Sequence, residues 1–331
     1  MKFIIDSAIP YIKGILEPYA EVIYRSGESF SKEDVADADM LIIRTRTKCN
    51  SDLLEGSSVK LIATATIGFD HIDLGYCTQR GIEVVTAQGC NAAGVLQWVA
   101  AALATLCKEE NWQPHERTLG VVGVGNVGSL VEQYARSWGF NILCCDPPRQ
   151  AKEGGDFISF EELLSRSDIV TMHTPLDAAT RHMIRPETLA LMRPDATLIN
   201  ASRGEVADTQ ALLAAPQKLI LDVWENEPSI DRALLAKALL STPHIAGYSK
   251  QGKANATAAV VRAAAKRFSL PLLDWYPEDV QPAVRQNIGW QQMCESIDGV
   301  CDIAAQSREL KENPDTFESL RNSYNYREEY F

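Results

Sequence analysis

A short glycine-rich stretch restricts the fold of this chain more than any other part of its sequence. Residues 118–146 begin with a valine-rich segment, continue through Gly123, Gly125 and Gly128, and end at Asp146. A G-x-G-x-x-G spacing between a strand and a helix is typical of the turn that binds a dinucleotide phosphate. An acid about twenty residues further on is typical of the group that binds the ribose hydroxyls. Together these features predict a parallel βαβ unit that binds NAD.

Each glycine has a separate expected task in that unit. Gly123 permits the tight turn, Gly125 lets the backbone approach the pyrophosphate, and Gly128 lets the helix pack closely on the strand. The N-terminus of the helix that follows would offer backbone amides and its positive dipole end to the phosphates, and Asn126 and Val127 in this turn are also candidate cofactor residues. The alternative is a glycine turn in an unrelated α/β domain.

Further cofactor contacts are expected where other strands end. Asp146 would repel a 2′-phosphate and so favours NAD over NADP, although the nearby Arg149 weakens this preference. Ligands of open α/β sheets bind at the carboxyl ends of the strands. The other candidate cofactor residues at such ends are Thr174, Pro175, Ala201, Ser202, Arg203, Asp222 and Gly247.

Strand-like and helix-like segments alternate along most of the chain, which favours parallel sheets covered by helices on both faces. The predicted strands are 2–6, 20–24, 38–44, 59–65, 81–87, 118–125, 141–146, 168–176, 196–202 and 218–224. The predicted helices are 11–19, 31–38, 91–110, 129–140, 160–167, 185–192, 208–215 and 253–269. We therefore predict an α/β fold with two Rossmann-like, doubly wound parallel sheets, followed by a polar and aromatic tail of about 60 residues that is short for a core of its own.

Charge and composition exclude several classes of partner. The formal net charge of −12 over 331 residues argues against binding to nucleic acid or to an anionic membrane. No apolar run approaches the roughly 20 residues that span a bilayer, and the N-terminus lacks the layout of a signal peptide, so we expect a cytoplasmic protein. The eight cysteines have no metal-ligand spacing, and we expect no metal site and reduced thiols.

Three polar residues follow strands downstream of the glycine turn and suggest acid–base chemistry. Arg203, Glu227 and His244 occur in this order. A histidine can take up a hydroxyl proton, a carboxylate can orient it, and an arginine can bind a substrate carboxylate. Glu225 competes with Glu227 for the middle role. Taken singly, Arg203 could be a surface cation and His244 a helix cap.

The motifs GVGNVG, HTPL, NASRG, DVWENEP and PHIAG, in this order and spacing, resemble those of the D-isomer-specific 2-hydroxyacid dehydrogenases. The resemblance implies that Arg203 grips the substrate carboxylate and C2 oxygen, that His244 is the acid/base, and that Glu227 stabilises its protonated form. It also implies an active-site cleft between two domains. The implied bounds are 1–92 and 245–268 for a flavodoxin-like substrate domain, 93–244 for the NAD domain, and 269–331 for a shortened C-terminal dimerisation domain.

The segments RTRTKCN, TATIGFDHID and HIAGYSKQGK resemble those of family members whose substrate is a phosphorylated hydroxy acid and which form homodimers. The resemblance implies that Tyr248, where relatives are usually small, faces the substrate. The remaining candidate substrate residues are Arg44, Thr45, Thr66, Ile67 and Gly68. The phosphate would be met by Arg44 or by a basic tail residue such as Arg321.

Two alternative functions stay open at this point. A family member acting on 3-phosphoglycerate or on a simple 2-hydroxy acid would share every catalytic residue. From another class, a non-catalytic NAD-sensing corepressor that binds peptides would need an exposed apolar groove, which the sequence does not indicate.

Overall fold

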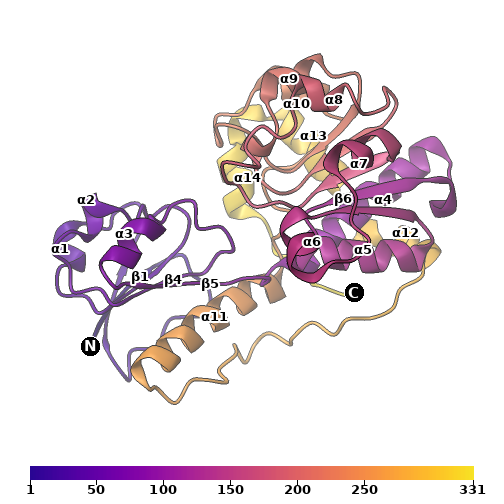
Figure 1. The fold of residues 1–331 in the computed structure, drawn as a ribbon. Helices are drawn as coiled ribbons and strands as arrows, with labels where there is room; N and C mark the ends of the chain where they lie inside the picture. Colours follow the sequence, from indigo (N-terminus) through magenta and orange to yellow (C-terminus); the bar gives the residue numbers. More distant parts are fainter. The chain divides into compact units, whose positions relative to one another are not determined.

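A computed structural model of the protein describes residues 1–331, which divide into two compact units. The first consists of residues 1–91 and 250–282, and the second of residues 92–249 and 283–331 (Figure 1). Both are built on a sheet whose paired strands are all parallel. The predicted α/β class with two doubly wound parallel sheets is confirmed.

The first unit contains a five-stranded sheet in the order β2-β1-β3-β4-β5. Its strands are β1 (Lys2–Asp6), β2 (Glu21–Arg25), β3 (Met40–Ile43), β4 (Leu61–Thr64) and β5 (Glu83–Thr86). Its helices are α1 (Lys32–Val35), α2 (Ser51–Leu54), α3 (Leu74–Gln79) and α11 (Lys250–Phe268).

Both faces of this sheet are apolar, because its central strands β3 and β4 are buried at every position and successive residues of a strand point to opposite sides. Phe3 and Ile5 of β1 pack with residues of α11, such as Val261, on one face. Ile4 of the same strand packs on the other face in a cluster that includes Leu54 of α2. Figure 1 shows α11 along one side of the sheet and α1, α2 and α3 on the other.

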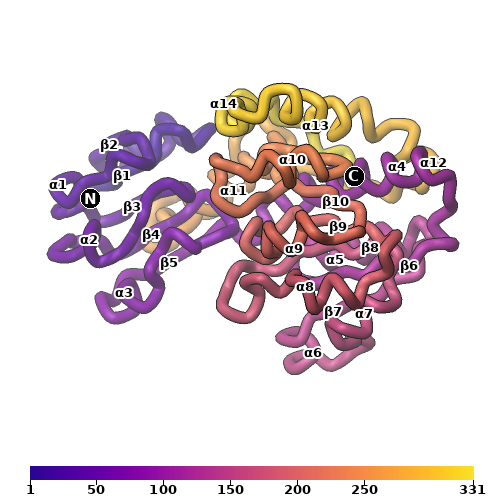
Figure 2. The backbone as a smooth tube through the Cα atoms, turned by 90° about the horizontal axis from the view of Figure 1, so that it is seen from above, coloured from indigo at the N-terminus to yellow at the C-terminus, as the bar shows by residue number.

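The second unit contains a six-stranded sheet in the order β11-β10-β9-β8-β6-β7 (Figure 2). Its strands are β6 (Thr118–Val122), β7 (Asn141–Cys145), β8 (Ile169–Met172), β9 (Thr197–Asn200), β10 (Lys218–Leu221) and β11 (Leu240–Ser241). Its helices are α4 (Ala92–Glu110), α5 (Asn126–Trp138), α6 (Pro147–Glu153), α7 (Phe160–Arg166), α8 (Pro186–Leu189), α9 (Thr209–Ala214), α10 (Arg232–Lys237), α12 (Trp290–Ser296), α13 (Ile303–Glu312) and α14 (Phe317–Ser323), with short 3₁₀ turns at Pro114–Glu116, Gly204–Val206, Ile297–Gly299 and Pro314–Thr316.

Helix α4 is apolar on nearly every side and is buried, as its sequence predicts. It packs with α5 on one face of the second sheet, while α7, α9 and α10 contribute to the core on the other face. No helix of the protein is both long enough and apolar enough to cross a membrane.

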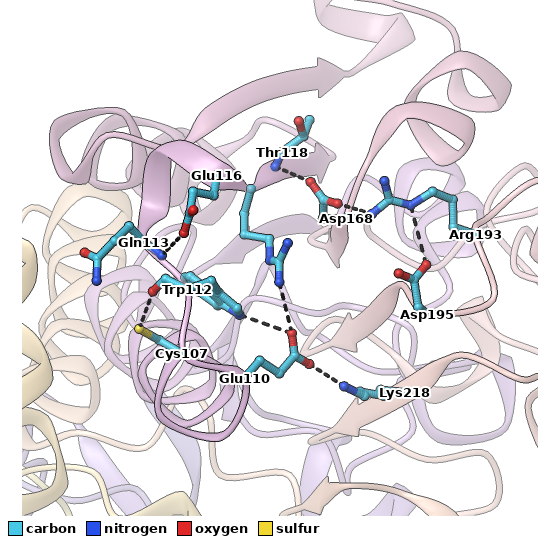
Figure 3. A network of polar contacts seen from close by, with 11 residues as sticks. Cys107, Glu110, Trp112, Gln113, Glu116, Thr118, Asp168, Arg193, Asp195 and Lys218 are labelled. Atoms are coloured by element: carbon cyan, nitrogen blue, oxygen red, sulfur yellow. Dashed lines mark hydrogen bonds and ion pairs between the residues drawn. The ribbon is translucent and has the colours of Figure 1, made fainter.

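A network of ion pairs and hydrogen bonds connects the end of α4 and the amino ends of several strands (Figure 3). Glu110 at the end of α4 pairs with Lys218, the first residue of β10, and lies 3.6 Å from Arg117. Asp168, just before β8, accepts a hydrogen bond from the Thr118 amide at 2.6 Å and pairs with Arg193. These contacts hold the strand starts in register and leave the carboxyl ends free for function.

The helix predicted over 11–19 is wrong, because these residues form successive turns. Tyr11 and Gly14 adopt the positive φ angles 61° and 86°, which a helix does not contain, and Pro18 lacks the amide that a helix interior needs.

The C-terminal segment differs from the predicted separate domain 269–331. Residues 269–282 group with the first unit and 283–331 with the second. The apolar side chains of Met293, Ile297 and Phe331 join the core formed by α4 and α5, so this part of the tail completes an existing core instead of making its own. Figure 2 shows α13 and α14 beside α10.

Candidate active site

Most predicted site residues lie at the carboxyl ends of strands in the second sheet. Gly123 follows β6 and Asp222 follows β10, while His244 lies three residues after β11. The order of the strands reverses between β6 and β8, and such a switch point is where open α/β sheets bind ligands. The glycine turn therefore stands at the position expected for the cofactor.

The turn has the backbone geometry that its glycines predict. Gly123 has φ +81°, and a Cβ there would lie 2.8 Å from the carbonyl carbon and oxygen of His173. Gly125 caps α5, which begins with Asn126 and Val127, and an added Cβ would meet no atom within 4 Å. Open space beside a helix N-terminus is what an approaching phosphate requires.

Asp146 closes the turn from the next strand. One carboxylate oxygen accepts the Val124 amide at 2.8 Å, and the other accepts the Arg149 amide at 2.9 Å. The Arg149 guanidinium donates to the Val124 carbonyl at 2.7 Å and pairs with Glu153 at 2.9 Å. Arg149 thus has its own partners within the protein, which supports the NAD preference deduced from Asp146.

The surroundings of β8 also fit a bound NAD. The Thr174 hydroxyl is buried without a hydrogen-bond partner, and such a group is normally satisfied by a ligand or water. Pro175 follows, and its carbonyl accepts the Thr180 hydroxyl at 2.7 Å. Burial lowers the pKa of the adjacent His173 to about 3, so this imidazole stays neutral. The residues present therefore suit a dinucleotide, and no group of histidine, cysteine and acidic side chains suits a metal ion.

Substituting Gly128 by alanine is expected to disable the cofactor turn. The added Cβ would lie 2.0 Å from the Gly123 carbonyl oxygen, so α5 must move away from β6. We expect NADH affinity, measured by fluorescence titration, to fall at least about tenfold, equivalent to about 1.4 kcal/mol. Gly299→Ala, whose Cβ meets nothing within 4 Å, is the matched control, and equal NADH affinity in both variants would contradict the packing role of Gly128.

Glu227 and His244 form a half-buried acid–base pair. His244 Nδ1 lies 2.7 Å from Glu227 Oε2, and the other carboxylate oxygen accepts the Trp224 amide at 3.0 Å. Burial raises the pKa of Glu227, but His244, Arg321 and the Trp224 amide together outweigh it, so this pKa lies below its ordinary value. An ionised carboxylate on Nδ1 orients the ring and leaves Nε2 for a substrate proton.

Glu225, the competing acid, belongs to a different pair. Its Oε1 lies 2.7 Å from His182 Nε2, and its Oε2 accepts the Thr209 amide at 2.9 Å. The segment 225–227 therefore presents two glutamates to two histidines. The geometry joins Glu227, and not Glu225, to His244.

Two buried side chains hold the backbone that carries His244, which itself has φ +57°. Asp222, predicted as a cofactor residue, accepts the Ile245 amide at 2.8 Å and the Ala246 amide at 2.9 Å. The guanidinium of Arg327 donates to the carbonyls of the same two residues. The Arg327 contacts could not be found from sequence, because no local pattern connects residues 82 positions apart.

The Arg203 loop is shaped by its neighbour Asn200. The Asn200 side chain accepts the Ser202 amide and hydroxyl at 3.0 and 2.8 Å and donates to the Arg203 carbonyl at 3.0 Å. Ala201 lies between them and packs partly against the core. At Gly204 a Cβ would lie 2.0 Å from the Trp224 carbonyl carbon, so the loop following β9 runs directly against the segment that leads to Glu227. Asn200 and Gly204 belong to the motif NASRG but were not among the individual candidate residues predicted from sequence.

The remaining second-unit candidates follow His244 directly. Gly247 is half-buried, and its carbonyl lies close to the backbone of α4, where a Cβ on Gly94 would meet it at 3.4 Å. Tyr248 is half-buried, and its hydroxyl accepts a hydrogen bond from Arg321 at 3.1 Å.

The other predicted substrate residues belong to the first unit, where Arg44 stands at the switch point between β1 and β3. Its Nε lies 3.0 Å from a carboxylate oxygen of Asp6, which is fully buried, and this pair fixes the arginine side chain. Thr45 follows it and is exposed. The Thr66 hydroxyl lies 2.6 Å from that of Thr64 and donates to the Gly68 carbonyl at 3.1 Å. Ile67 lies between them and is half-buried.

Comparison with known proteins agrees with this architecture. Residues 96–246 match the family model for the D-isomer specific 2-hydroxyacid dehydrogenase, NAD binding domain. The D-lactate dehydrogenase of Aquifex aeolicus, solved with NAD and lactic acid, is 27% identical with a TM-score of 0.66, and the match covers 82% of this chain and 96% of that one. The 3-phosphoglycerate dehydrogenase of Entamoeba histolytica, 24% identical, shares the fold with a TM-score of 0.67 over 82% of this chain and 97% of its own.

Curated relatives match nearly the whole chain. The erythronate-4-phosphate dehydrogenase of Bacteroides thetaiotaomicron is 44% identical over 99% of this chain and 97% of its own length. That of Porphyromonas gingivalis is 39% identical over 98% of this chain and 92% of its own. The chain therefore belongs to the D-isomer-specific 2-hydroxyacid dehydrogenase family and, within it, to the group of the erythronate-4-phosphate dehydrogenases.

Proposed function

We propose that this protein oxidises 4-phospho-D-erythronate to 2-oxo-3-hydroxy-4-phosphobutanoate with NAD, a step in the biosynthesis of pyridoxal 5′-phosphate. The single observation that carries the chemistry is the His244–Glu227 pair, 2.7 Å long, on the same sheet edge as the dinucleotide turn. The names of relatives that match nearly the whole chain support the choice of substrate.

In this proposal the side chains of the second unit divide the work. Nε2 of His244 accepts the proton of the C2 hydroxyl, while Glu227 on Nδ1 stabilises the imidazolium that results. Arg203 binds the substrate carboxylate and the C2 oxygen, where negative charge develops. The nicotinamide ring of NAD, when bound, would accept the hydride that leaves C2.

The cofactor would be held by residues at the same edge. The helix that starts at Asn126 faces the pyrophosphate and Asp146 the ribose hydroxyls, with Thr174 offering its unpaired buried hydroxyl. The other proposed contacts are Gly123, Gly125, Val127, Gly128, Pro175, Ala201, Ser202, Arg203, Asp222 and Gly247.

Recognition of the phosphorylated acid is proposed for two groups of residues. Arg44, fixed by the buried Asp6, supplies a cation with defined direction, which suits an anionic substrate. Tyr248 supplies a hydroxyl directly after the His244 turn. The other residues of this proposal are Thr45, Thr66, Ile67 and Gly68.

We also propose that the protein is cytoplasmic and acts as a homodimer with the C-terminal segment in its interface. Sedimentation equilibrium would test the dimer.

The substrate assignment is tested with three acids in parallel. NADH formation, or fluorescence of enzyme-bound cofactor in a single turnover, is followed with 4-phosphoerythronate, 3-phosphoglycerate and D-lactate. We expect kcat/KM for 4-phosphoerythronate to exceed the other values at least about a hundredfold, because this acid is the substrate named for the relatives that match nearly the whole chain and a site built for one acid discriminates strongly against others. If another acid is oxidised and 4-phosphoerythronate is not, the proposed substrate is contradicted but the proposed type of reaction still holds. No turnover of any acid would favour a non-catalytic NAD-binding protein.

A further inference from the structure

The C-terminal segment sends one arginine to the candidate active site. Arg321 lies on α14, and only 26% of its side chain is exposed. Its Nε donates to the Tyr248 hydroxyl at 3.1 Å, and its Nη1 lies 3.6 Å from Glu227 Oε2. One planar guanidinium therefore reaches both the predicted substrate-facing tyrosine and the predicted catalytic acid.

These contacts continue to the proton acceptor. The Glu227 oxygen beside Arg321 is the same Oε2 that contacts His244 Nδ1. A carboxylate that contacts two cationic or cation-forming groups on one oxygen is confined in rotation more than one that contacts a single group. Arg321 thus helps determine where Glu227 holds the imidazole.

Neighbouring tail residues restrict Tyr248 from the sides. Its ring meets that of Tyr324 at 6.2 Å and that of Tyr326 at 5.9 Å, both in T-shaped arrangements. Such edge contacts favour one ring orientation. With Arg321 on its hydroxyl, the position of Tyr248 is defined at the ring and at the oxygen by residues 321–326 of the same chain.

We propose that Arg321 is a positioning residue, which links the substrate-facing Tyr248 to the Glu227–His244 pair and so joins substrate recognition to proton transfer. This rests on the proposed roles of His244 and Tyr248. A lysine cannot replace it fully, because a single ammonium group lacks the fork that makes two contacts in fixed directions.

The test compares Arg321→Met, Arg321→Lys, Tyr248→Phe and the double variant Arg321→Met/Tyr248→Phe in the full-length protein. Arg321→Met is expected to lower kcat/KM about 10- to 100-fold. Arg321→Lys should recover part of this loss by restoring the charge. Because Arg321 acts partly through Tyr248, the double variant should lose clearly less than the product of the two single losses. The dissociation constant for NADH should stay within about twofold, because the glycine turn does not contact Arg321.

Arg308→Met is the matched control, since it makes the same chemical change on the exposed side of the neighbouring helix α13 and should keep wild-type kinetics. The inference is overturned if Arg321→Met keeps kcat/KM within twofold of wild type. It is equally overturned if the single losses multiply in the double variant, or if NADH affinity falls in parallel with kcat/KM. If Arg321→Met does not fold, Arg321→Lys decides, with a loss of at least about fivefold expected and a loss below twofold contradicting the role.

A measurement without turnover separates this inference from the proposed function. In protein labelled with ¹⁵N-histidine, the His244 signals are assigned by their absence in His244→Ala. They should move in Arg321→Met and not in Arg308→Met, whether or not any acid is a substrate. Unchanged His244 signals in Arg321→Met would overturn the link from Arg321 through Glu227 to His244. If only 4-phosphoerythronate fails to react, the proposed substrate alone is overturned, and the kinetic series is then run with the acid that is oxidised.

Discussion

Replacing His244 by alanine is expected to lower kcat by roughly 10²- to 10⁴-fold, equivalent to about 3–5 kcal/mol, while NADH still binds within about twofold of wild type. The variant removes the imidazole that pairs with Glu227, which is the proposed acceptor of the C2 hydroxyl proton. The backbone of the loop keeps its amide contacts to Asp222, and the glycine turn is unaffected. Initial rates and NADH titration on the same preparation measure both quantities.

The protein contains a matched control for this experiment. His182 contacts Glu225 at the same distance of 2.7 Å, and Glu225 lies only two residues before Glu227 in the chain. Like His244, His182 has a positive φ angle. His182→Ala therefore removes an equivalent pair and should retain most of the activity. If instead His182→Ala were inactive and His244→Ala active, the proton acceptor would belong to the Glu225 pair.

Replacing Arg327 by methionine is expected to lower the free energy of unfolding of the second unit by about 3–5 kcal/mol. Arg327 is 7% exposed and donates to the carbonyls of Ile245, Ala246 and Gly94, the last at 2.7 Å. Without it, these buried acceptors lose their donor. Glu329, 8% exposed, loses a nearby cation as well. Burial raises the pKa of this carboxyl, and Arg327 is one of the groups that oppose the rise.

Urea unfolding followed by tryptophan fluorescence measures this effect, since five of the six tryptophans, all except Trp275, lie in the second unit. The control is again Arg308→Met, which removes an exposed arginine from the same segment. A change below about 1 kcal/mol in Arg327→Met would contradict the view that the tail secures the His244 loop.

The parts of the fold that could be predicted from sequence are those with a local signal. The valine-rich strand, the glycine spacing and the acid of 118–146 lie within one continuous segment, so their pattern can be recognised without other parts of the chain. The buried helix α4 was likewise evident from its uninterrupted apolar sequence. The segment 11–19 has helical spacing, yet the turn residues Gly14 and Pro18 prevail over that pattern.

The tail shows why other parts could not be predicted. Its short length and its polar and aromatic composition suggested that it packs against another domain or subunit, but a single sequence does not reveal which distant groups a charged residue meets. The buried guanidinium of Arg327 donates hydrogen bonds to carbonyls that lie 81 to 233 positions away in the sequence. Arg321 donates to Tyr248 across 73 positions. Such pairs exist only after the fold has brought the tail to β11 and α4, so the candidate residues Glu227 and His244 have a local sequence signal and the residues that support them do not.

The discontinuity of the first unit has a consequence for the order of events during synthesis. One apolar face of its sheet, which includes Phe3, Ile5 and Met40, is covered by α11, but that helix begins only at residue 250. At the usual rate of translation, the ribosome needs roughly 10–30 s to extend the chain from residue 91 to residue 250. The first-made strands therefore wait for a late-made helix, and the intervening second unit has time to begin folding before the first is complete.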